Sequence, residues 1–138
     1  MFGVLRKRRV RQQLAATEDC AGQAGDLYDC GYNCAQAVLQ ATTGRSDPEL
    51  LAMAEAFGAG IGASGCLCGA VTGGVMALGL SGRADCSAEL VTAFRREFGT
   101  TCCRGLSKNY RWLSREHKAN CRHLTVTAAT LVAQLLES

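Results

Sequence analysis

The chain has 138 residues, of which 48% are hydrophobic and 20% charged, and its formal net charge at pH 7 is +3. A chain of this length and hydrophobicity is suited to a single compact domain with one core. Alanine, leucine and glycine are abundant, there is one proline, and no segment alternates apolar and polar residues as a half-buried strand does. We therefore expect an all-α single domain, a compact bundle of about five to six helices.

Positive charge is concentrated at the N-terminus. Residues 1–11 contain five basic side chains, whereas residues 12–138 carry ten basic and twelve acidic groups. The chain is accordingly divided into a basic N-terminal arm, residues 1–11, and a helical cysteine-rich domain, residues 12–138, for which a redox role is considered below. The arm has no interleaved aromatic residues and no recognisable nucleic-acid-binding module, so we expect a solvated or docking tail and no nucleic-acid partner.

Cysteine usage and the absence of targeting signals indicate a reducing compartment. There are nine cysteines, an odd number that leaves at least one thiol outside any intramolecular disulfide. The basic start is not followed by an apolar run of signal-peptide length, and no segment has the length of a transmembrane helix. We expect a cytoplasmic protein, in which a cysteine excess more often indicates metal binding or catalysis than structural disulfides.

Capping signals predict the first helices. A helix is expected over residues 12–27, although two glycines within it lower its helix propensity. Asn33 is a favoured N-cap and places Cys34 in the first turn of a second helix, which Gly44 should end.

The next two helices are separated by a glycine-rich segment. Asp-Pro at residues 47–48 predicts a capped helix that ends at Gly58. Residues 60–65 match the dinucleotide-binding pattern G-x-G-x-x-G, but no strand pattern precedes them, so nucleotide binding is not favoured. A helix is then expected from Cys68 to about Leu80.

Small residues occupy the first turns of the helix that follows Cys68. Gly69, Ala70, Gly73 and Gly74 would let another helix or a bulky cofactor approach the backbone closely. Simple helix packing explains them equally well, so Gly69 and Gly73 are candidates for cofactor contact and for a helix–helix contact alike.

Two helices are expected in the C-terminal part. One spans about residues 86–98, with Asp85 as its cap and Gly99 as its end. The last spans about residues 119–136 and carries Cys121 on its core-facing stripe.

No covalent haem site is present, because the chain contains no Cys-x-x-Cys-His sequence. The two histidines, His117 and His123, lie in a charged stretch, where exposed imidazoles are expected rather than axial ligands.

Four cysteines lie in different predicted helical contexts, without the spacing of a zinc finger or a thioredoxin motif. They are Cys34, Cys68, Cys103 and Cys121. Any site that they form must therefore be assembled by the fold. Cys68 lies at the mouth of an apolar helix, where free N–H groups and the helix dipole favour a thiolate, so we expect its pKa to be low. Taken singly, each of the four is also consistent with a small buried hydrophobe.

Several segments resemble the C-GCAxxG-C-C family of redox-active proteins, and together they span about residues 28–136. The similar segments are residues 33–38, 57–62 and 68–73, Phe94, Phe98-Gly99, Cys103-Arg104 and Cys121. The resemblance implies a small helical fold and a redox role, with Cys34, Cys68, Cys103 and Cys121 as the defining cysteines. It also implies kinship with the part of split-Soret cytochromes proposed to hold an iron–sulfur cluster. By analogy we expect a homodimer.

Five cysteines fall outside that pattern. Cys20 and Cys86 lie in polar surroundings and are expected to tolerate serine. Cys66 and Cys102, neighbours of the defining cysteines, are candidates for an additional or replacement ligand, and Cys30 is assigned no role.

Three functions are consistent with these observations. We favour an electron-transfer protein in which Cys34, Cys68, Cys103 and Cys121 bind an iron–sulfur cluster. The main alternative is a cofactor-free thiol/disulfide oxidoreductase, with Cys68 as the attacking thiol and Cys34 or Cys103 as its resolving partner. The third is a non-redox helical interaction module, or one that binds zinc or copper. A redox partner protein is implied, and no residue identifies it.

Overall fold

The computed structural model describes residues 19–138. The basic arm and residues 12–18 of the first expected helix lie outside the described residues. Residues 19–138 contain no strand, so the predicted all-α single domain is confirmed. Six helices in this part of the chain have eight residues or more: α2 (Cys20–Asp29), α3 (Cys34–Thr43), α4 (Pro48–Glu55), α5 (Gly69–Leu80), α6 (Ser87–Phe98) and α8 (Arg115–Glu137). The short helix α7 (Cys103–Leu106) and two 3-10 turns, η1 (Ile61–Ala63) and η2 (Ala84–Cys86), complete the elements.

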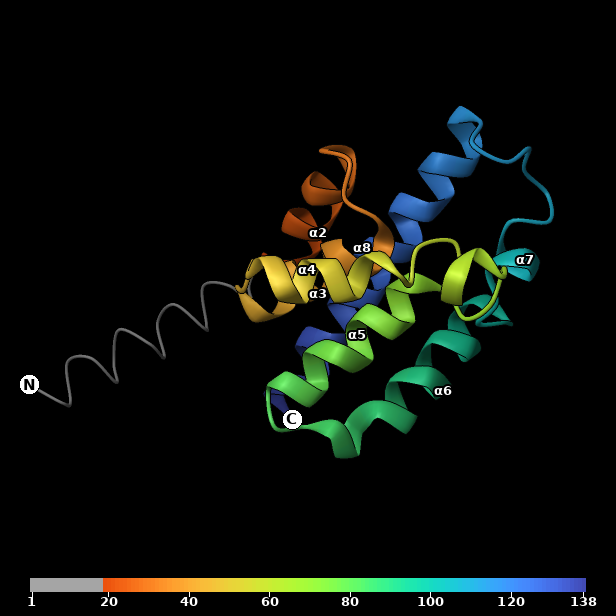
Figure 1. The fold of residues 1–138 in the computed structure, drawn as a ribbon. Helices are drawn as coiled ribbons and strands as arrows, with labels where there is room; N and C mark the ends of the chain where they lie inside the picture. The colour runs from red at the N-terminus through yellow and green to blue at the C-terminus, as the bar shows by residue number, and fades with distance from the viewer. Residues whose placement is uncertain (1–18) are drawn as a thin grey trace, which may run out of the picture.

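Helix α5 lies in the middle of the bundle, where it contacts α3, α6 and α8 (Figure 1). Helix α2 packs against α3 and α8. The largest fully buried side chains come from α3, α5, α6 and α8: Leu39, Val38, Val71, Leu78, Leu90, Phe94, Thr125 and Val132. No helix within residues 19–138 combines the length and the apolar character needed to cross a membrane.

The predicted ends of α3 and α6 are present. The Asn33 side chain accepts a hydrogen bond from the N–H of Gln36 at 2.8 Å, and the N–H of Asn33 donates to the Gln36 side chain at 3.0 Å. This reciprocal pair is a capping box. Gly44 and Gly99 end α3 and α6 with φ of 70° and 82°, a left-handed conformation that glycine adopts without steric cost.

Two acidic residues expected as helix caps bind arginines instead. Asp47 precedes α4 but makes no side-chain cap, because its carboxylate forms an ion pair with Arg45. Asp85 lies within η2, and its carboxylate is 3.6 Å from the Arg83 guanidinium. Helix α6 consequently begins at Ser87 without a side-chain cap.

The last helix begins at Arg115 rather than near residue 119. The cause is Ser114, whose side chain accepts a hydrogen bond from the N–H of His117 at 3.1 Å. The longer helix carries His117 into the interior, where its exposed fraction is 3%. The expectation that His117 is a surface imidazole is therefore wrong, whereas His123 is exposed as predicted.

Helices α3 and α5 cross with their backbones in contact. A Cβ on Gly73 would lie 2.5 Å from the carbonyl oxygen of Ala35, and a Cβ on Gly69 would lie 3.3 Å from the Ala35 nitrogen. Only glycine permits this approach. As a result Cys34, the first residue of α3, and Cys68, which directly precedes α5, face the same cavity.

Replacing Gly73 by alanine should lower the free energy of unfolding by about 1–3 kcal/mol, because the new Cβ forces α3 away from α5. Urea unfolding measures this change. Gly79→Ala in the same helix is the matched control, since nothing lies within 4 Å of its added Cβ. It should raise the free energy of unfolding by about 0.5–1 kcal/mol, and equal effects of the two substitutions would contradict the backbone contact.

Candidate thiol redox site

The structure brings the four predicted cysteines to one cavity of about 650 Å³. Its walls come from α2, the N-terminal ends of α3 and α5, α7 and the first turns of α8. The lining includes Cys34, Cys68, Cys103, Cys121, Tyr28, Tyr32, Gly69, Trp112, His117, Lys118 and Arg122. Gly73, a candidate for cofactor contact, lies against the backbone of α3 and is not among the lining residues.

Cys68 and Cys103 form a hydrogen-bonded pair with opposite pKa shifts. The Cys68 thiol donates to Cys103, and the Gly69 N–H at the start of α5 donates to the same sulfur. The hydrogen bond from Cys68 is the main cause that lowers the pKa of Cys103 from 9.0 to about 7. Donating that hydrogen bond, together with burial, raises the pKa of Cys68 well above its usual range. Close to neutral pH the pair therefore holds one thiolate and one thiol.

The prediction that Cys68 has a low pKa is wrong. Its side chain is only 2% exposed, and burial disfavours the charged form. The N–H of Ala70 lowers the pKa of Cys68, but this effect is smaller than those of Cys103 and of burial. The first N–H of α5, from Gly69, points instead to Cys103. The helix N-terminus thus favours a thiolate, as expected, but on the cysteine supplied by α7.

Cys34 and Cys121 form a second pair of the same kind. The Cys34 thiol donates to Cys121, which raises the pKa of Cys34 well above its usual range and lowers that of Cys121. The Tyr28 hydroxyl also donates to Cys121. Burial is the main cause that raises the pKa of Tyr28, so this hydroxyl keeps its proton and remains a donor.

His117 adds a donor to the second pair. Its Nδ1 accepts a hydrogen bond from the N–H of Leu113 at 3.0 Å, so a neutral ring carries its proton on Nε2. That Nε2 lies 3.2 Å from the Ser107 hydroxyl and 3.6 Å from the Cys121 sulfur. Burial lowers the pKa of His117, which favours the neutral ring. The sequence signal for this residue is the Ser114 cap, which shows that the helix starts before His117.

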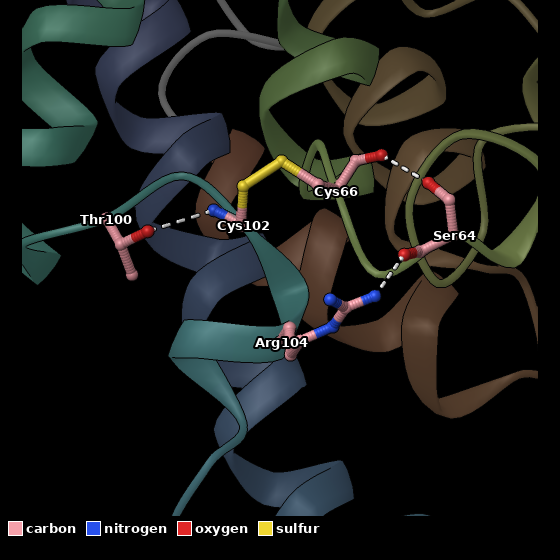
Figure 2. Close-up of a disulfide and its surroundings, with 5 residues drawn as sticks. All are labelled: Ser64, Cys66, Thr100, Cys102 and Arg104. Atoms are coloured by element: carbon pink, nitrogen blue, oxygen red, sulfur yellow. Dashed lines mark hydrogen bonds between the residues drawn. A yellow bond between two sulfur atoms is a disulfide. The ribbon is translucent and has the colours of Figure 1, made fainter.

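Cys66 and Cys102, expected as possible extra ligands, are joined by a disulfide (Figure 2). Bonded to each other, they present no thiolate to a metal. The disulfide lies between two backbone hydrogen bonds, from Cys68 N–H to the Thr101 carbonyl at 2.7 Å and from Arg104 N–H to the Gly65 carbonyl at 2.9 Å. These contacts hold the segment before α5 beside the segment before α7. They consequently position Cys68 next to Cys103.

The remaining cysteines lie outside the cavity lining. Cys20 and Cys86 are both buried; the expectation of polar surroundings is wrong for Cys20, which lies in an apolar cluster, but Cys86 lies beside Arg83 and Asp85 as expected. The Cys20 thiol donates to the Ala41 carbonyl at 3.2 Å, and the Cys86 sulfur is 3.0 Å from the Arg83 guanidinium. Cys30 is exposed.

The four cavity thiols fit an iron–sulfur cluster in number but not in arrangement. Four thiolates are the donor set of an iron–sulfur cluster, and the number and chemistry of the cysteines fit it. Their placement is different, because each thiol is hydrogen-bonded within its own pair. In the part of the chain that the structure describes, no group of three or more His, Cys, Asp or Glu side chains is arranged to hold a metal ion.

We predict that Cys103 is the first of the free thiols to be alkylated. Its reaction with limiting iodoacetamide should follow the thiolate fraction, with a midpoint near pH 7, because the thiolate is the nucleophile. Peptide mapping by mass spectrometry from pH 5 to pH 10 measures this. Labelling of Cys68 before Cys103 at neutral pH would contradict the assignment of the thiolate.

A pair of substitutions at Cys68 tests the origin of the low pKa. Cys68→Ala removes the donor, so the pKa of Cys103 should move back toward 9.0 and its alkylation at pH 7 should slow by about tenfold. Cys68→Ser keeps a hydroxyl donor and should retain most of the shift. If both variants alkylate Cys103 as fast as the unchanged protein, the hydrogen bond from Cys68 does not set the pKa.

Comparison with known proteins gives one match. The sequence model of the family described as "Putative redox-active protein (C_GCAxxG_C_C)" matches residues 32–135. No curated protein and no solved structure shows significant similarity to the chain. The matched range covers most of the chain and includes all four cysteines of the cavity. The protein therefore belongs to the C_GCAxxG_C_C family of redox-active proteins.

Proposed function

We propose that this protein carries out thiol–disulfide redox chemistry, with Cys103 as the attacking thiolate and Cys68 as the resolving thiol. The observation that carries the proposal is the polarised pair, in which one sulfur is ionised near neutral pH and its hydrogen-bonded neighbour keeps a proton. Exchange requires such a division, because one thiolate must attack first and a second thiol must then displace the product. The family's redox activity supports the same class of chemistry.

The reaction proceeds in two displacements. The Cys103 thiolate attacks one sulfur of a substrate disulfide; the S–S bond breaks, and its electron pair leaves on the other substrate sulfur. Cys68 then loses its proton and attacks the Cys103 sulfur, which releases the second substrate sulfur as a thiolate. The protein gives up two electrons and forms a Cys68–Cys103 disulfide, and the substrate becomes two thiols.

Cys34 and Cys121 are proposed as a second dithiol. Cys121 is the sulfur with the lowered pKa, and it accepts hydrogen bonds from Cys34 and Tyr28. The two pairs also influence each other electrostatically, since Cys103 raises the pKa of Cys34 and of Cys121. Loss of the Cys103 charge on oxidation would therefore favour ionisation of the second pair.

An iron–sulfur cluster is the second candidate, favoured by the convergence of four thiols on one cavity. Cys34, Cys68, Cys103 and Cys121 would hold it, and it would supply one-electron transfer. Each hydrogen-bonded pair would have to separate, with loss of its proton, to bind iron. Zinc and copper(I) suit the same soft donors.

A cytoplasmic location and a homodimer remain proposals from the sequence. Size-exclusion chromatography with light scattering measures the oligomeric state.

Mild oxidation of protein purified without oxygen should lower the number of free thiols by two for each pair that is oxidised. Peptide mapping should then identify a Cys68–Cys103 disulfide. Cys103→Ser and Cys68→Ser should each abolish this disulfide, and the double variant should lose nothing further, because the two residues act as one unit. Cys30→Ser is the matched control, since Cys30 is free and exposed; it should leave disulfide formation unchanged.

Protein purified without oxygen also distinguishes the dithiol function from the iron–sulfur cluster. A colourless protein that forms the Cys68–Cys103 disulfide supports the dithiol. A brown protein with iron and acid-labile sulfide, which are lost together in any of the four cysteine variants, would replace the dithiol by the cluster.

A further inference from the structure

We propose that the cavity selects small anionic disulfides, with Lys118 as the residue that recognises their negative charge. The inference rests on the proposed thiol–disulfide function and names its substrate class. It starts from the size of the cavity and from the charges of its lining residues.

The location of the thiols favours a small molecule over a protein substrate. Cys68 is 2% exposed, and Cys103 is partly buried beside it, so exchange takes place inside the cavity. A volume of about 650 Å³ lies within the range of small-molecule pockets. It admits a disulfide with two short substituents and excludes a folded domain.

Basic residues are concentrated in the segment of the chain that carries Lys118. Residues 108–118 contain four basic side chains and one acidic one, all exposed: Lys108, Arg111, Arg115, Lys118 and Glu116. None of these four cations forms an ion pair with another residue in the range 19–138. No ion pair within these residues therefore neutralises the four charges.

Lys118 is the cation of this group that also lines the cavity. The other basic lining residue, Arg122, is engaged by two carboxylates, Asp29 at 3.0 Å and Asp26 at 3.8 Å. The pairing of Arg122 also neutralises Asp29, the acidic residue in the lining. Lys118 is left as the unopposed charge at the walls. It offsets the repulsion that an anionic disulfide meets when it approaches the Cys103 thiolate.

Three model disulfides measure this selectivity. Dithiodiglycolate is anionic, cystamine is cationic and hydroxyethyl disulfide is neutral, and all three carry short substituents of similar size. The protein is reduced and freed of reductant without oxygen and then mixed with each disulfide. Exchange is quenched with N-ethylmaleimide, and the loss of labelled Cys103 is followed by peptide mapping. The same three disulfides are mixed with free 2-mercaptoethanol. Its rates give the intrinsic reactivity of each disulfide toward a thiol that lies in no cavity.

We expect the ratio of the dithiodiglycolate rate to the cystamine rate to exceed that of 2-mercaptoethanol by about tenfold at low ionic strength, and to fall as salt is added. Lys118→Glu should lower this ratio by about tenfold or more. The rate with the neutral hydroxyethyl disulfide reports any effect of the substitution on the Cys103 thiolate, and such an effect is common to all three disulfides and cancels in the ratio. Arg96→Glu on α6 is the matched control: it changes the net charge equally but lies outside the cavity lining, and it should keep the ratio.

The outcomes distinguish the inference from the function on which it rests. A ratio equal to that of 2-mercaptoethanol, with Cys103 still reactive, would overturn the anionic substrate class and leave the dithiol intact. The same loss in Lys118→Glu and Arg96→Glu would show that net charge, and not Lys118, sets the preference. A Cys103 that exchanges with none of the three disulfides would overturn both the inference and the proposed function.

Discussion

The backbone contact between α3 and α5 is the constraint on which the site depends. Gly73 lies so close to Ala35 that a single added carbon would meet the α3 backbone. At this separation the first residue of α3 and the residue before α5 face one cavity, and the free N–H of Gly69 is aimed into it. A wider crossing would move Cys34 away from Cys68. It would also withdraw the helix N-terminus from the thiolate of Cys103.

Polarity within each pair arises chiefly from the hydrogen bond between its two sulfurs, and the deeper burial of the donor sulfur adds to it. Cys68 is almost fully enclosed, so its charged form is penalised, and the proton stays on this sulfur and is shared with Cys103. Cys103 is more open and receives a second hydrogen bond from Gly69. The same hydrogen bond therefore stabilises a thiolate at the sulfur that a substrate reaches and a thiol at the sulfur behind it. Cys34 and Cys121 repeat the arrangement, with Tyr28 as the additional donor.

Local features of the sequence predicted the fold well, whereas the chemistry of single thiols depended on contacts between distant segments. Asn33 as an N-cap and glycine at the ends of α3 and α6 act within one helical turn, and they are present as predicted. The expected low pKa of Cys68 was wrong, because the donors at the start of α5 are shared with a residue from α7, whose position no local pattern specifies. The burial of His117 differs from the prediction because the Ser114 cap starts α8 at Arg115 and so includes His117 in the helix.

The position of Cys102 explains why two adjacent cysteines take part in different chemistry. Its backbone is extended, with φ of −95° and ψ of 132°, and an extended residue turns successive side chains to opposite sides. Cys102 therefore bonds Cys66 while Cys103 faces the cavity. Hydrogen bonds from Cys68 to Thr101 and from Arg104 to Gly65 fix this alternation on either side of the disulfide. The bonded pair and the reactive pair therefore lie on opposite sides of the segment that carries Cys102 and Cys103.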